Sequence, residues 1–261
     1  MSEKFKISNL DLYYGDFHAL KDINMSIHAN EITAFIGPSG CGKSTFLKSL
    51  NRMNDLVEGC KITGNVLLDG EDIYKGMDVN LLRKRVGMVF QKPTLFPWLT
   101  VEKNISFSLR MQNKFKGNEE EVERMLKVIG LEEFRDDYPG QLSGGMAQRV
   151  ALVRTLINHP KILLLDEPLG ALDAFTRMNM QDEILDIWKK RKQLVVMVTH
   201  DVDEAIYMGT RVIAMEANPG QIKADIPIEL PYPRDRSSAE FVGYRNQILG
   251  LLNYGSGEKG E

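Results

Sequence analysis

The sequence has few cysteines and no long apolar run. Only Cys41 and Cys60 occur among its 261 residues, and Cys41 lies inside a glycine-rich loop. We therefore expect no structural disulfide, which fits a reducing compartment. The start, residues 1–6, lacks the long apolar run of a signal peptide, and no stretch approaches the length needed to span a bilayer. A role at a membrane would need a partner that holds the chain there.

An excess of one charge is also absent, since 33 Lys and Arg offset 36 Asp and Glu to a net charge of −3. There is no internal repeat and no basic stripe, so the composition gives no general attraction to nucleic acid or anionic lipid. The hydrophobic fraction of 43% and the charged fraction of 26% are ordinary for a globular protein. The length allows one large α/β domain, or a core with a subdomain.

What the sequence does contain is a phosphate-binding loop of the form G-x-x-x-x-G-K-[ST]. Its residues are Gly37, Pro38, Ser39, Gly40, Cys41, Gly42, Lys43, Ser44 and Thr45. The apolar, β-prone run 31–36 precedes it, and the run 44–54, with apolar residues at helical spacing, follows it. The alternative is a glycine-rich turn with a chance Lys-Ser pair. The placement between a strand and a helix favours the phosphate-binding loop.

The chemistry of this loop follows from its residues. Glycines let successive N–H groups point inward at an anion, and the following helix adds its positive end. Lys43 supplies a mobile cation for the outer phosphates, and the Ser44 hydroxyl is a suitable ligand for Mg²⁺. The loop therefore predicts nucleotide binding.

Two strands, 6–14 and 18–27, precede the loop and are expected to form an antiparallel hairpin. In the first, Leu10 and Leu12 share a face with Tyr14, whereas Ile7 falls out of phase. In the second, the candidates for inward-facing residues are Leu20, Ile23, Met25 and Ile27. The ring of Tyr14 could stack on a nucleotide base. A half-buried strand tyrosine is the simpler alternative.

A second group of elements follows the first helix. Strands are expected over 62–68 and 86–90, and Arg83-Lys84-Arg85 between them is expected to be a solvated face. Gln91 closes the second strand, where a polar side chain can reach a metal or water. An exposed-looking apolar loop, 95–99, and helices over 101–111 and 119–129 then form a mainly helical insert.

The stretch 142–146, Leu-Ser-Gly-Gly-Met, opens a helix that is expected to reach residue 158. Ser143 can cap this helix, and Gly144 and Gly145 expose backbone N–H groups at its positive end. The stretch is either a second anion site or a simple capped helix start.

Two acidic residues end a buried strand expected over 161–166. Asp166 can hold Mg²⁺ beside Ser44, and Glu167 can take a proton from an attacking water. Adjacent strand residues face opposite ways, so the two should have different roles. His200 follows another buried strand, 194–198, at the same end of a parallel sheet. It is either a functional residue or a satisfied core or surface histidine.

The remaining pattern completes the expected organisation. It comprises a loop at 170–173, a helix to residue 190, a strand over 211–215, a turn at Pro219-Gly220, an extended segment over 226–234, a helix over 238–252 and a polar tail, 255–261. We predict a β-subdomain and the first part of a phosphate-loop core over 1–92, a helical subdomain over 93–160, the second part of the core over 161–230, and a C-terminal helix and tail over 231–261.

In its motifs and their order, the chain resembles the ATP-binding subunit of an ATP-binding-cassette (ABC) transporter. The shared motifs are the aromatic Tyr14, the phosphate loop 37–45, a glutamine loop at Gln91, the signature 142–146, the Walker B strand 162–166 with Glu167, the D-loop 171–173 and the switch histidine His200. The signature departs from the commonest pattern at Met146, a residue also found in importer ATPases. The resemblance implies an α/β fold with a phosphate-loop core, an antiparallel β-subdomain and a helical subdomain.

The resemblance also implies roles. Tyr14 would stack on adenine, and Lys43 with backbone N–H groups of the phosphate loop would hold the phosphates of ATP. Mg²⁺ would be served by Ser44, Gln91 and Asp166. Glu167 would be the general base, and His200 would contact the γ-phosphate. Two subunits would pair head to tail, so that Ser143, Gly144, Gly145 and Asp173 of one complete the ATP site of the other.

Within the family the signals are divided. The part from about Asn9 to Lys92 is similar to phosphate-import ATPases, whereas the part from Thr94 onward is similar to the nitrate, taurine and alkanesulfonate group. The latter likeness includes 96–101, 142–149, 170–177 and 231–236. The expected permease contact lies in the second half, at Phe96, Pro97 and Trp98. We therefore favour an importer of a small anion of the nitrate or sulfonate type, with phosphate as the alternative.

Two other classes of function are less well supported by the sequence. A soluble cassette ATPase that acts on nucleic acid or in cluster assembly would need a basic stripe, tandem cassettes or a long coiled-coil insertion. A phosphate-loop kinase or switch would have no use for the signature or for His200. The predicted subunit would sit peripherally at the cytoplasmic face of the cell membrane, with a permease and, indirectly, a substrate-binding protein as partners.

Overall fold

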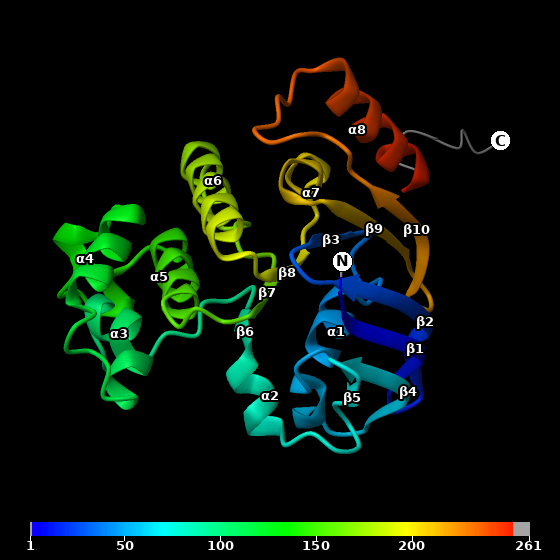
Figure 1. Ribbon diagram of the computed structural model, residues 1–261, viewed down its shortest axis with the longest axis horizontal. Helices are drawn as coiled ribbons and strands as arrows, with labels where there is room; N and C mark the ends of the chain where they lie inside the picture. The colour runs from blue at the N-terminus through cyan, green and yellow to red at the C-terminus, as the bar shows by residue number, and fades with distance from the viewer. Residues whose placement is uncertain (1, 253–261) are drawn as a thin grey trace. The chain divides into compact units, whose positions relative to one another are not determined.

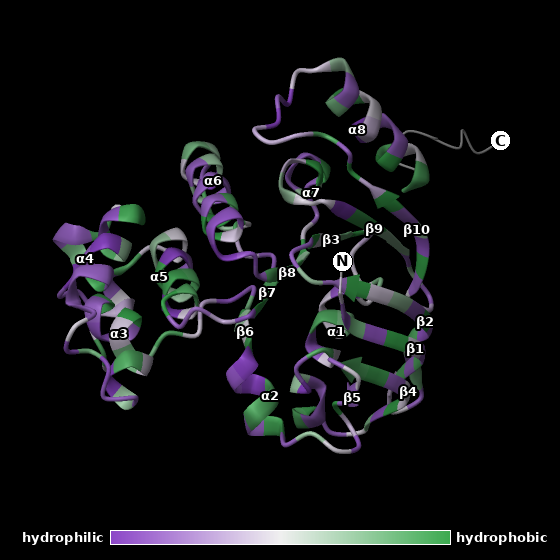
Figure 2. Ribbon diagram, viewed as in Figure 1, coloured by the Kyte–Doolittle hydropathy of each residue, from purple (hydrophilic) through white to green (hydrophobic). Residues whose placement is uncertain are grey.

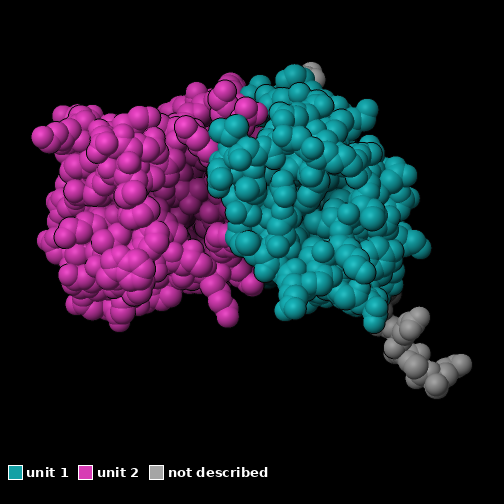
Figure 3. Space-filling view, turned by 90° about the horizontal axis from the view of Figure 1, so that it is seen from below, with its two compact units in different colours: residues 1–83, 194–261 teal, residues 84–193 magenta. Residues whose placement is uncertain are grey.

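The computed structural model describes residues 2–252, so the predicted tail over 255–261 lies outside the described residues. The chain divides into two compact units (Figure 3). Unit 1 comprises residues 1–83 and 194–261, and unit 2 comprises residues 84–193. Within residues 2–252, no helix is both long enough and apolar enough to cross a membrane.

Unit 1 contains an antiparallel sheet in the order β2-β1-β4-β5. Its strands are β1 (Glu3–Tyr14), β2 (Phe17–His28), β4 (Cys60–Leu68) and β5 (Glu71–Asp72). β1 lies between β2 and β4 and pairs with both (Figure 1). The predicted hairpin is therefore confirmed, with both strands longer than expected.

A bulge in β1 explains one error of the sequence analysis. The register with β2 shifts between Ile7 and Leu10, and Asn9 between them has a left-handed φ of 50°. The extra residue restores the phase, so Ile7 is buried on the same side as Leu10 and Leu12. The prediction that Ile7 falls out of phase was wrong for this reason. In β2 all four predicted inward residues are buried, and hydrophobic and hydrophilic bands alternate along both strands (Figure 2).

Unit 1 also holds four further strands, β3 (Ile32–Ile36), β8 (Leu194–Val198), β9 (Arg211–Glu216) and β10 (Gln221–Pro227). β3 pairs in parallel with β8 and β9, and β10 pairs antiparallel with β9. Every residue of β3 and β8 is buried, as expected for parallel strands covered on both faces. The extended segment expected over 226–234 instead divides into the end of β10 and an irregular stretch.

The helices of unit 1 are α1 (Lys43–Ser49), α7 (Val202–Met208) and α8 (Ala239–Leu251), with a 3-10 turn, η1 (Met53–Leu56). A further helix, α2 (Val79–Arg85), begins in unit 1 and ends in unit 2. α1 ends five residues earlier than predicted, because Arg52 has a left-handed φ of 58°. The sequence analysis missed α2 and α7, each only seven residues long. Arg83 is not simply solvated, since it donates hydrogen bonds to the carbonyls of Asn51 and Arg52.

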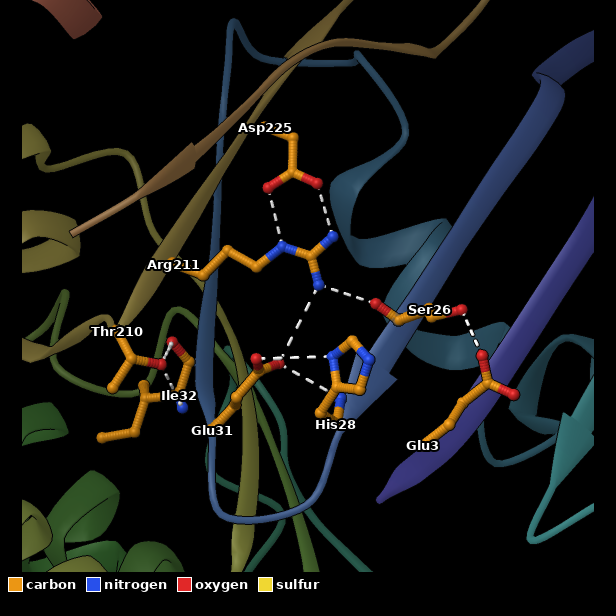
Figure 4. Close-up of polar contacts among 8 residues, drawn as sticks. All are labelled: Glu3, Ser26, His28, Glu31, Ile32, Thr210, Arg211 and Asp225. Atoms are coloured by element: carbon orange, nitrogen blue, oxygen red, sulfur yellow. Dashed lines mark hydrogen bonds and ion pairs between the residues drawn. The ribbon is translucent and has the colours of Figure 1, made fainter. Parts of the chain in front are cut away.

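A polar network links several strands of unit 1 at Arg211 (Figure 4). The guanidinium makes a two-pronged contact with Asp225 of β10, with an Nε–Oδ1 distance of 2.7 Å. It also donates to the Ser26 carbonyl at 2.6 Å and lies 3.8 Å from a Glu31 carboxylate oxygen. Its charged partners raise the pKa of Arg211, with the Asp225 hydrogen bonds as the largest cause. This network ties β9 to β10 and to the end of β2.

Unit 2 contains the parallel pair β6 (Val86–Val89) and β7 (Ile162–Asp166) and the helical insert. Its helices are α3 (Val101–Met111), α4 (Glu119–Val128), α5 (Gly144–Leu156) and α6 (Ala174–Arg191), with 3-10 turns η2 (Glu132–Phe134) and η3 (Pro139–Gln141). The predicted helices are confirmed to within two residues at most ends. α3 packs against α5 and α4 through buried apolar faces.

The two cysteines both lie in unit 1. Buried Cys41 and partly exposed Cys60 are free thiols, as expected.

Candidate functional site

The phosphate loop lies between β3 and α1 of unit 1. Gly40 and Gly42 have left-handed φ values of 79° and 88°, which a residue with a Cβ adopts only at a cost. The Phe46 amide donates to the Gly42 carbonyl at 2.8 Å, so α1 begins directly at the loop. The Lys43 Nζ donates to the carbonyls of Gly37 and Pro38 at 2.8 and 2.9 Å. The loop therefore carries its own cation beside a helix N-terminus.

The β9–β10 connection packs against the same loop. A Cβ added to Gly37 would lie 2.5 Å from the Met215 carbonyl oxygen, and one added to Gly220 would lie 2.4 Å from the Cys41 carbonyl oxygen. Such close backbone approaches leave no room for a side chain. The shape of the loop therefore depends on residues more than 170 positions away in the sequence, which the motif by itself does not reveal.

Tyr14 is tied to the phosphate-loop helix by a hydrogen bond. Its hydroxyl donates to the Asn54 side chain at 2.9 Å, and the Asn54 amide donates to the Thr45 carbonyl and to Ser49 Oγ, both at 2.9 Å. Burial raises the pKa of Tyr14. The neighbouring Tyr13 ring stacks on His18, with centroids 4.1 Å apart. Sequence analysis missed Asn54, because a lone asparagine after a predicted helix carries no distinctive signal.

His200 lies beside the phosphate loop in the strand order of unit 1. β8 and β3 are parallel neighbours, and the Thr199 amide donates to the Phe35 carbonyl at 3.1 Å. His200 and Gly37, the first residue of the phosphate loop, therefore follow adjacent strands at the same edge of the sheet. Asp201 then caps α7, with its carboxylate accepting from the amides of Asp203 and Glu204 at 2.9 and 3.1 Å.

In unit 2, Gln91 and Glu167 meet at the ends of two paired strands. Val89 of β6 is in register with Leu165 of β7. Gln91 and Glu167 follow these two residues at the same distance along the chain. The Gln91 Nε2 donates to the Glu167 Oε2 at 2.7 Å. Asp166 ends β7 and is 2% exposed.

The backbone gives Asp166 and Glu167 different environments. Glu167 has a φ of 46° and lies outside β7, a conformation that is uncommon for a non-glycine residue and is concentrated at functional sites. The expected difference between the two carboxylates therefore comes from a turn in the backbone and not from strand alternation. The same turn explains the difference in exposure, since Glu167 is partly exposed and Asp166 is buried.

The signature and the D-loop lie together within unit 2. Ser143 caps α5 by accepting from the Met146 amide at 3.2 Å, as predicted. A Cβ added to Gly145 would lie 3.1 Å from the Ala171 carbonyl oxygen, whereas one added to Gly144 would meet nothing within 4 Å. Asp173 caps α6 by accepting from the Thr176 amide at 3.0 Å. This hydrogen bond is the largest cause of the lowered pKa of Asp173.

The loop over 94–100 is built around one buried amide. The Asn104 Oδ1 accepts from the Phe96 amide at 2.9 Å, and its Nδ2 donates to the carbonyls of Phe96, Leu99 and Thr100 at 2.9 to 3.1 Å. Phe96 also packs on Phe107, with centroids 4.4 Å apart. The Trp98 side chain, in contrast, is 70% exposed. Sequence analysis did not identify Asn104, whose role depends on the fold of the loop.

The donor set is consistent with a divalent cation that is bound largely through phosphates. Among residues 2–252, no group of three or more His, Cys, Asp or Glu side chains could hold a metal ion by itself. Mg²⁺ is usually bound in proteins by one or two side-chain oxygens, several waters and the phosphates of a nucleotide. The predicted ligands are a hydroxyl, an amide and a carboxylate, and all of these supply the hard oxygen atoms that Mg²⁺ prefers.

Comparison with known proteins decides the family. The family model described as "ABC transporter" matches residues 20–170, a span that contains the phosphate loop, Gln91, the signature and Glu167. The chain belongs to the ABC transporter family. It is thus an ATPase of that family, as the resemblance of the motifs predicted.

Relatives and solved structures extend this ABC transporter assignment over nearly the whole chain. An uncharacterized ABC transporter ATP-binding protein of Methanocaldococcus jannaschii is 45% identical over 97% of this chain and 92% of the relative. The aliphatic sulfonates import ATP-binding protein SsuB of Bacillus cereus is 42% identical over 92% and 91%, respectively. The SsuB protein of Bacillus licheniformis is 40% identical over 95% and 93%.

Solved structures confirm the fold. A dimeric ATP-binding cassette in a post-hydrolysis state, bound to ADP and Pi, has a TM-score of 0.75 and 31% identity, and covers 87% of this chain and 100% of that chain. A component of an ABC transporter complex of Clostridium perfringens has a TM-score of 0.75 and 28% identity, and covers 98% and 96%. The predicted fold class, an ABC-transporter nucleotide-binding domain, is therefore confirmed.

Proposed function

We propose that this chain is the ATP-hydrolysing subunit of an importer for a small organic anion, with aliphatic sulfonates as the cargo class. Two SsuB proteins at 40% identity or more, matched over at least 91% of their length, support this cargo class. The motifs 96–101, 170–177 and 231–236 in the second half of the chain support the same group. The phosphate alternative depended on a likeness in residues 9–92, and the relatives described above give it no support.

The observation that carries the enzymatic part of this proposal is the Gln91–Glu167 pair. Glu167 has a left-handed backbone at the end of β7 and accepts a hydrogen bond from Gln91 at 2.7 Å. A carboxylate at the end of a buried strand, oriented by an amide, suits a general base that takes a proton from the attacking water. Gln91 would orient that carboxylate until ATP and Mg²⁺ are bound.

The ligand roles follow the motifs. Lys43 and the backbone N–H groups of the phosphate loop would hold the phosphates of ATP, Tyr14 would face the adenine, and His200 would contact the γ-phosphate. Ser44, Gln91 and Asp166 would hold Mg²⁺, directly or through water. When bound, Mg²⁺ neutralises charge on the phosphates, which is a main requirement of phosphoryl transfer.

A second copy of the chain would complete the ATP site. The solved dimeric cassette supports a dimer for this chain. Ser143, Gly144 and Gly145 lie at the N-terminus of α5, where exposed backbone N–H groups favour an anion. In a head-to-tail pair, this end of α5 would cover the γ-phosphate bound by the other copy, with Asp173 close to it.

The membrane partner would dock on the loop around Phe96, Pro97 and Trp98. Trp98 is largely exposed, and the loop that presents it is held by the four hydrogen bonds of Asn104. A rigid, exposed aromatic residue is typical of a residue that anchors a protein interface. Such docking would hold the chain peripherally at the cytoplasmic face of the membrane, and a substrate-binding protein would act through the permease.

Replacing Glu167 by Gln tests the enzymatic proposal. The Glu167→Gln variant should bind ATP with unchanged affinity but hydrolyse it at least about 10²-fold more slowly, because the general base is lost. Lys43→Ala should lose affinity for ATP itself. Glu133→Gln, an identical change at an exposed residue of unit 2, is the control and should retain full turnover. Full turnover by Glu167→Gln would exclude Glu167 as the base.

A further inference from the structure

The motif Pro231-Tyr-Pro-Arg-Asp-Arg236 contributed to the likeness to the nitrate, taurine and alkanesulfonate group but has no role in the proposed chemistry. In the structure this 231–236 segment connects β10 to α8, and α8 packs against α7 (Figure 1). Both lie in unit 1 with His200. The segment and α8 together contact α7 at its two ends.

At the C-terminal end of α7, Arg234 is buried against main-chain carbonyls. Its side chain donates to the carbonyls of Ile206, Gly209, Leu230 and Ile228, with Nη1 2.5 Å from the Gly209 oxygen and Nε 3.1 Å from the Leu230 oxygen. The residue is 7% exposed, and burial lowers the pKa of its guanidinium. The last carbonyls of a helix lack partners within the helix and carry its negative end. Arg234 satisfies the Ile206 and Gly209 carbonyls at this end of α7 with a positive charge.

Tyr232 adds a second contact at the same end. Its hydroxyl donates to the Met208 carbonyl at 2.6 Å, and the Arg234 guanidinium lies 4.1 Å from the centre of its ring. Burial raises the pKa of Tyr232 to about 12, so the hydroxyl stays protonated and able to donate.

At the N-terminal end of α7, Arg245 of α8 forms a bidentate ion pair with Asp203. The Nε–Oδ1 and Nη2–Oδ2 distances are 2.5 and 2.7 Å. The Asp203 hydrogen bond is the largest cause of the raised pKa of Arg245. α8 is itself fixed by Phe241 and Ile248, which are fully buried.

This arrangement matters because α7 is only seven residues long. A helix of two turns has few internal hydrogen bonds and depends on tertiary contacts for its orientation. His200 immediately precedes the residue that caps α7, Asp201. A rotation or shift of α7 would therefore move His200.

We propose that Arg234 and Arg245 are positioning residues that orient α7 and thereby His200 for ATP hydrolysis. The inference depends on the role of His200 in the proposed function above. It gives the 231–236 segment and α8 a part in turnover although neither supplies a residue to the predicted ATP site.

The test measures kcat and KM for Mg·ATP with the full chain. Arg245→Gln and Arg234→Lys should lower kcat about five-fold or more, because small displacements of reacting groups are costly. KM should change less than about two-fold, since the phosphate loop is untouched. Arg245→Lys keeps the charge but loses the bidentate geometry, and should recover part of the kcat.

A double-mutant cycle separates positioning from general destabilisation. In a His200→Ala background, Arg245→Gln should cause no further loss of kcat, because there is no longer a histidine to orient. The matched control is Arg211→Gln, which breaks a comparable bidentate pair in unit 1, with Asp225. The polar partners of Arg211 are Asp225, Ser26 and Glu31, which lie outside α7. Arg211→Gln should leave kcat unchanged.

The outcomes are distinguishable. Full turnover by His200→Ala would overturn the proposed role of His200, and this inference with it. Loss of turnover in His200→Ala with normal kcat in both arginine variants would overturn this inference alone. An equal loss from Arg245→Gln with and without His200 would assign the arginines a structural role only. Arg245 is partly exposed, so its variants keep the test valid if the buried Arg234 cannot be replaced without unfolding.

Discussion

At the residue scale, the backbone holds several candidate functional groups in left-handed conformations. Glu167 has a φ of 46°, and Gly42 has a φ of 88°. The glycine adopts this conformation without steric cost, whereas the glutamate pays for it. The turn leaves Glu167 partly exposed, whereas Asp166 at the end of β7 is buried. Side-chain identity and backbone geometry therefore act together at this site.

Replacing Gly42 by Ala tests the geometry of the phosphate loop. An added Cβ would lie 2.6 Å from the Leu20 Cδ2 and 3.1 Å from the Ala19 carbonyl oxygen, in addition to the unfavourable φ. We expect at least about a ten-fold loss of ATP affinity, because relief of this clash would displace the loop backbone whose N–H groups hold the phosphates. Titration with a fluorescent ATP analogue measures this loss.

Gly70→Ala provides the matched control. Gly70 has a similar φ of 85°, but an added Cβ would meet nothing within 4 Å, and the residue lies in a turn after β4. This variant should be destabilised by about 1 kcal/mol with unchanged ATP affinity. Equal ATP affinities for the unmodified chain, Gly42→Ala and Gly70→Ala would show that the loop tolerates a side chain at position 42.

At the element scale, the loop over 94–100 combines a buried polar support with an exposed aromatic surface. Asn104 is fully buried and makes four hydrogen bonds to the loop. Arg154 of α5 donates to the Thr94 carbonyl at 2.8 Å and lies 5.4 Å from the centre of the Phe96 ring. The loop is therefore fixed by α3 and α5. Its Trp98 ring packs on Phe96, with centroids 5.6 Å apart, but is 70% exposed.

Replacing Trp98 by Ala should consequently weaken permease binding without affecting ATP affinity. A loss of about 2 kcal/mol or more in binding free energy is expected for an interface anchor. Met111→Ala is the control, because Met111 is also 70% exposed in the same unit. Co-purification with the permease, followed by titration, measures the effect. Equal binding by the two variants would place the docking surface elsewhere.

At the scale of the whole molecule, the chain carries two predicted anion-binding helix ends, one in each unit. The phosphate loop precedes α1 in unit 1, and the signature precedes α5 in unit 2. In the predicted dimer, each copy would therefore contribute its phosphate loop to one ATP site and its signature to the other.

Gly144→Glu tests this pairing in the Glu167→Gln background, which should form an ATP-bound dimer. The added side chain meets nothing within 4 Å, and an acid in the first turn of α5 should stabilise the monomer by about 0.5–1 kcal/mol. A bulky negative charge facing the γ-phosphate should nevertheless abolish the dimer while ATP affinity is retained. Size-exclusion chromatography with and without Mg·ATP measures the change.

Gly243→Glu makes the same substitution in α8, again with no atom within 4 Å of the added Cβ, and should still dimerise. If Gly144→Glu also dimerised with ATP, the signature end of α5 would not face the partner's nucleotide.

Local sequence patterns predicted the strands and helices with the strongest periodicity. β8 and α3 agree residue for residue with the predicted ranges, and Ser143 caps α5 as expected. The motifs also predicted the family, because the phosphate loop, Gln91, the signature and Glu167 occur in a fixed order. The roles of Tyr14, His200 and the Mg²⁺ ligands remain predictions, as do the domain boundaries.

The errors occurred where a nonlocal contact or a single backbone angle decided the structure. The bulge at Asn9 restored the phase of Ile7, and the φ of Arg52 ended α1 early. α7 has too few residues to show a helical period, and it is fixed by Arg234 and Arg245, which follow it by 26 and 37 positions.

The sequence by itself determined which chemical groups this protein has and the order in which they occur, because each motif is a short run whose spacing is set by local geometry. Only the tertiary structure decided how those groups are supported. Three such contacts join segments that are far apart in the chain: Gly220 against the phosphate loop, Gln91 beside Glu167, and Arg234 at the end of α7. Their contacts depend on strand register and buried hydrogen bonds, which no local pattern of residues encodes.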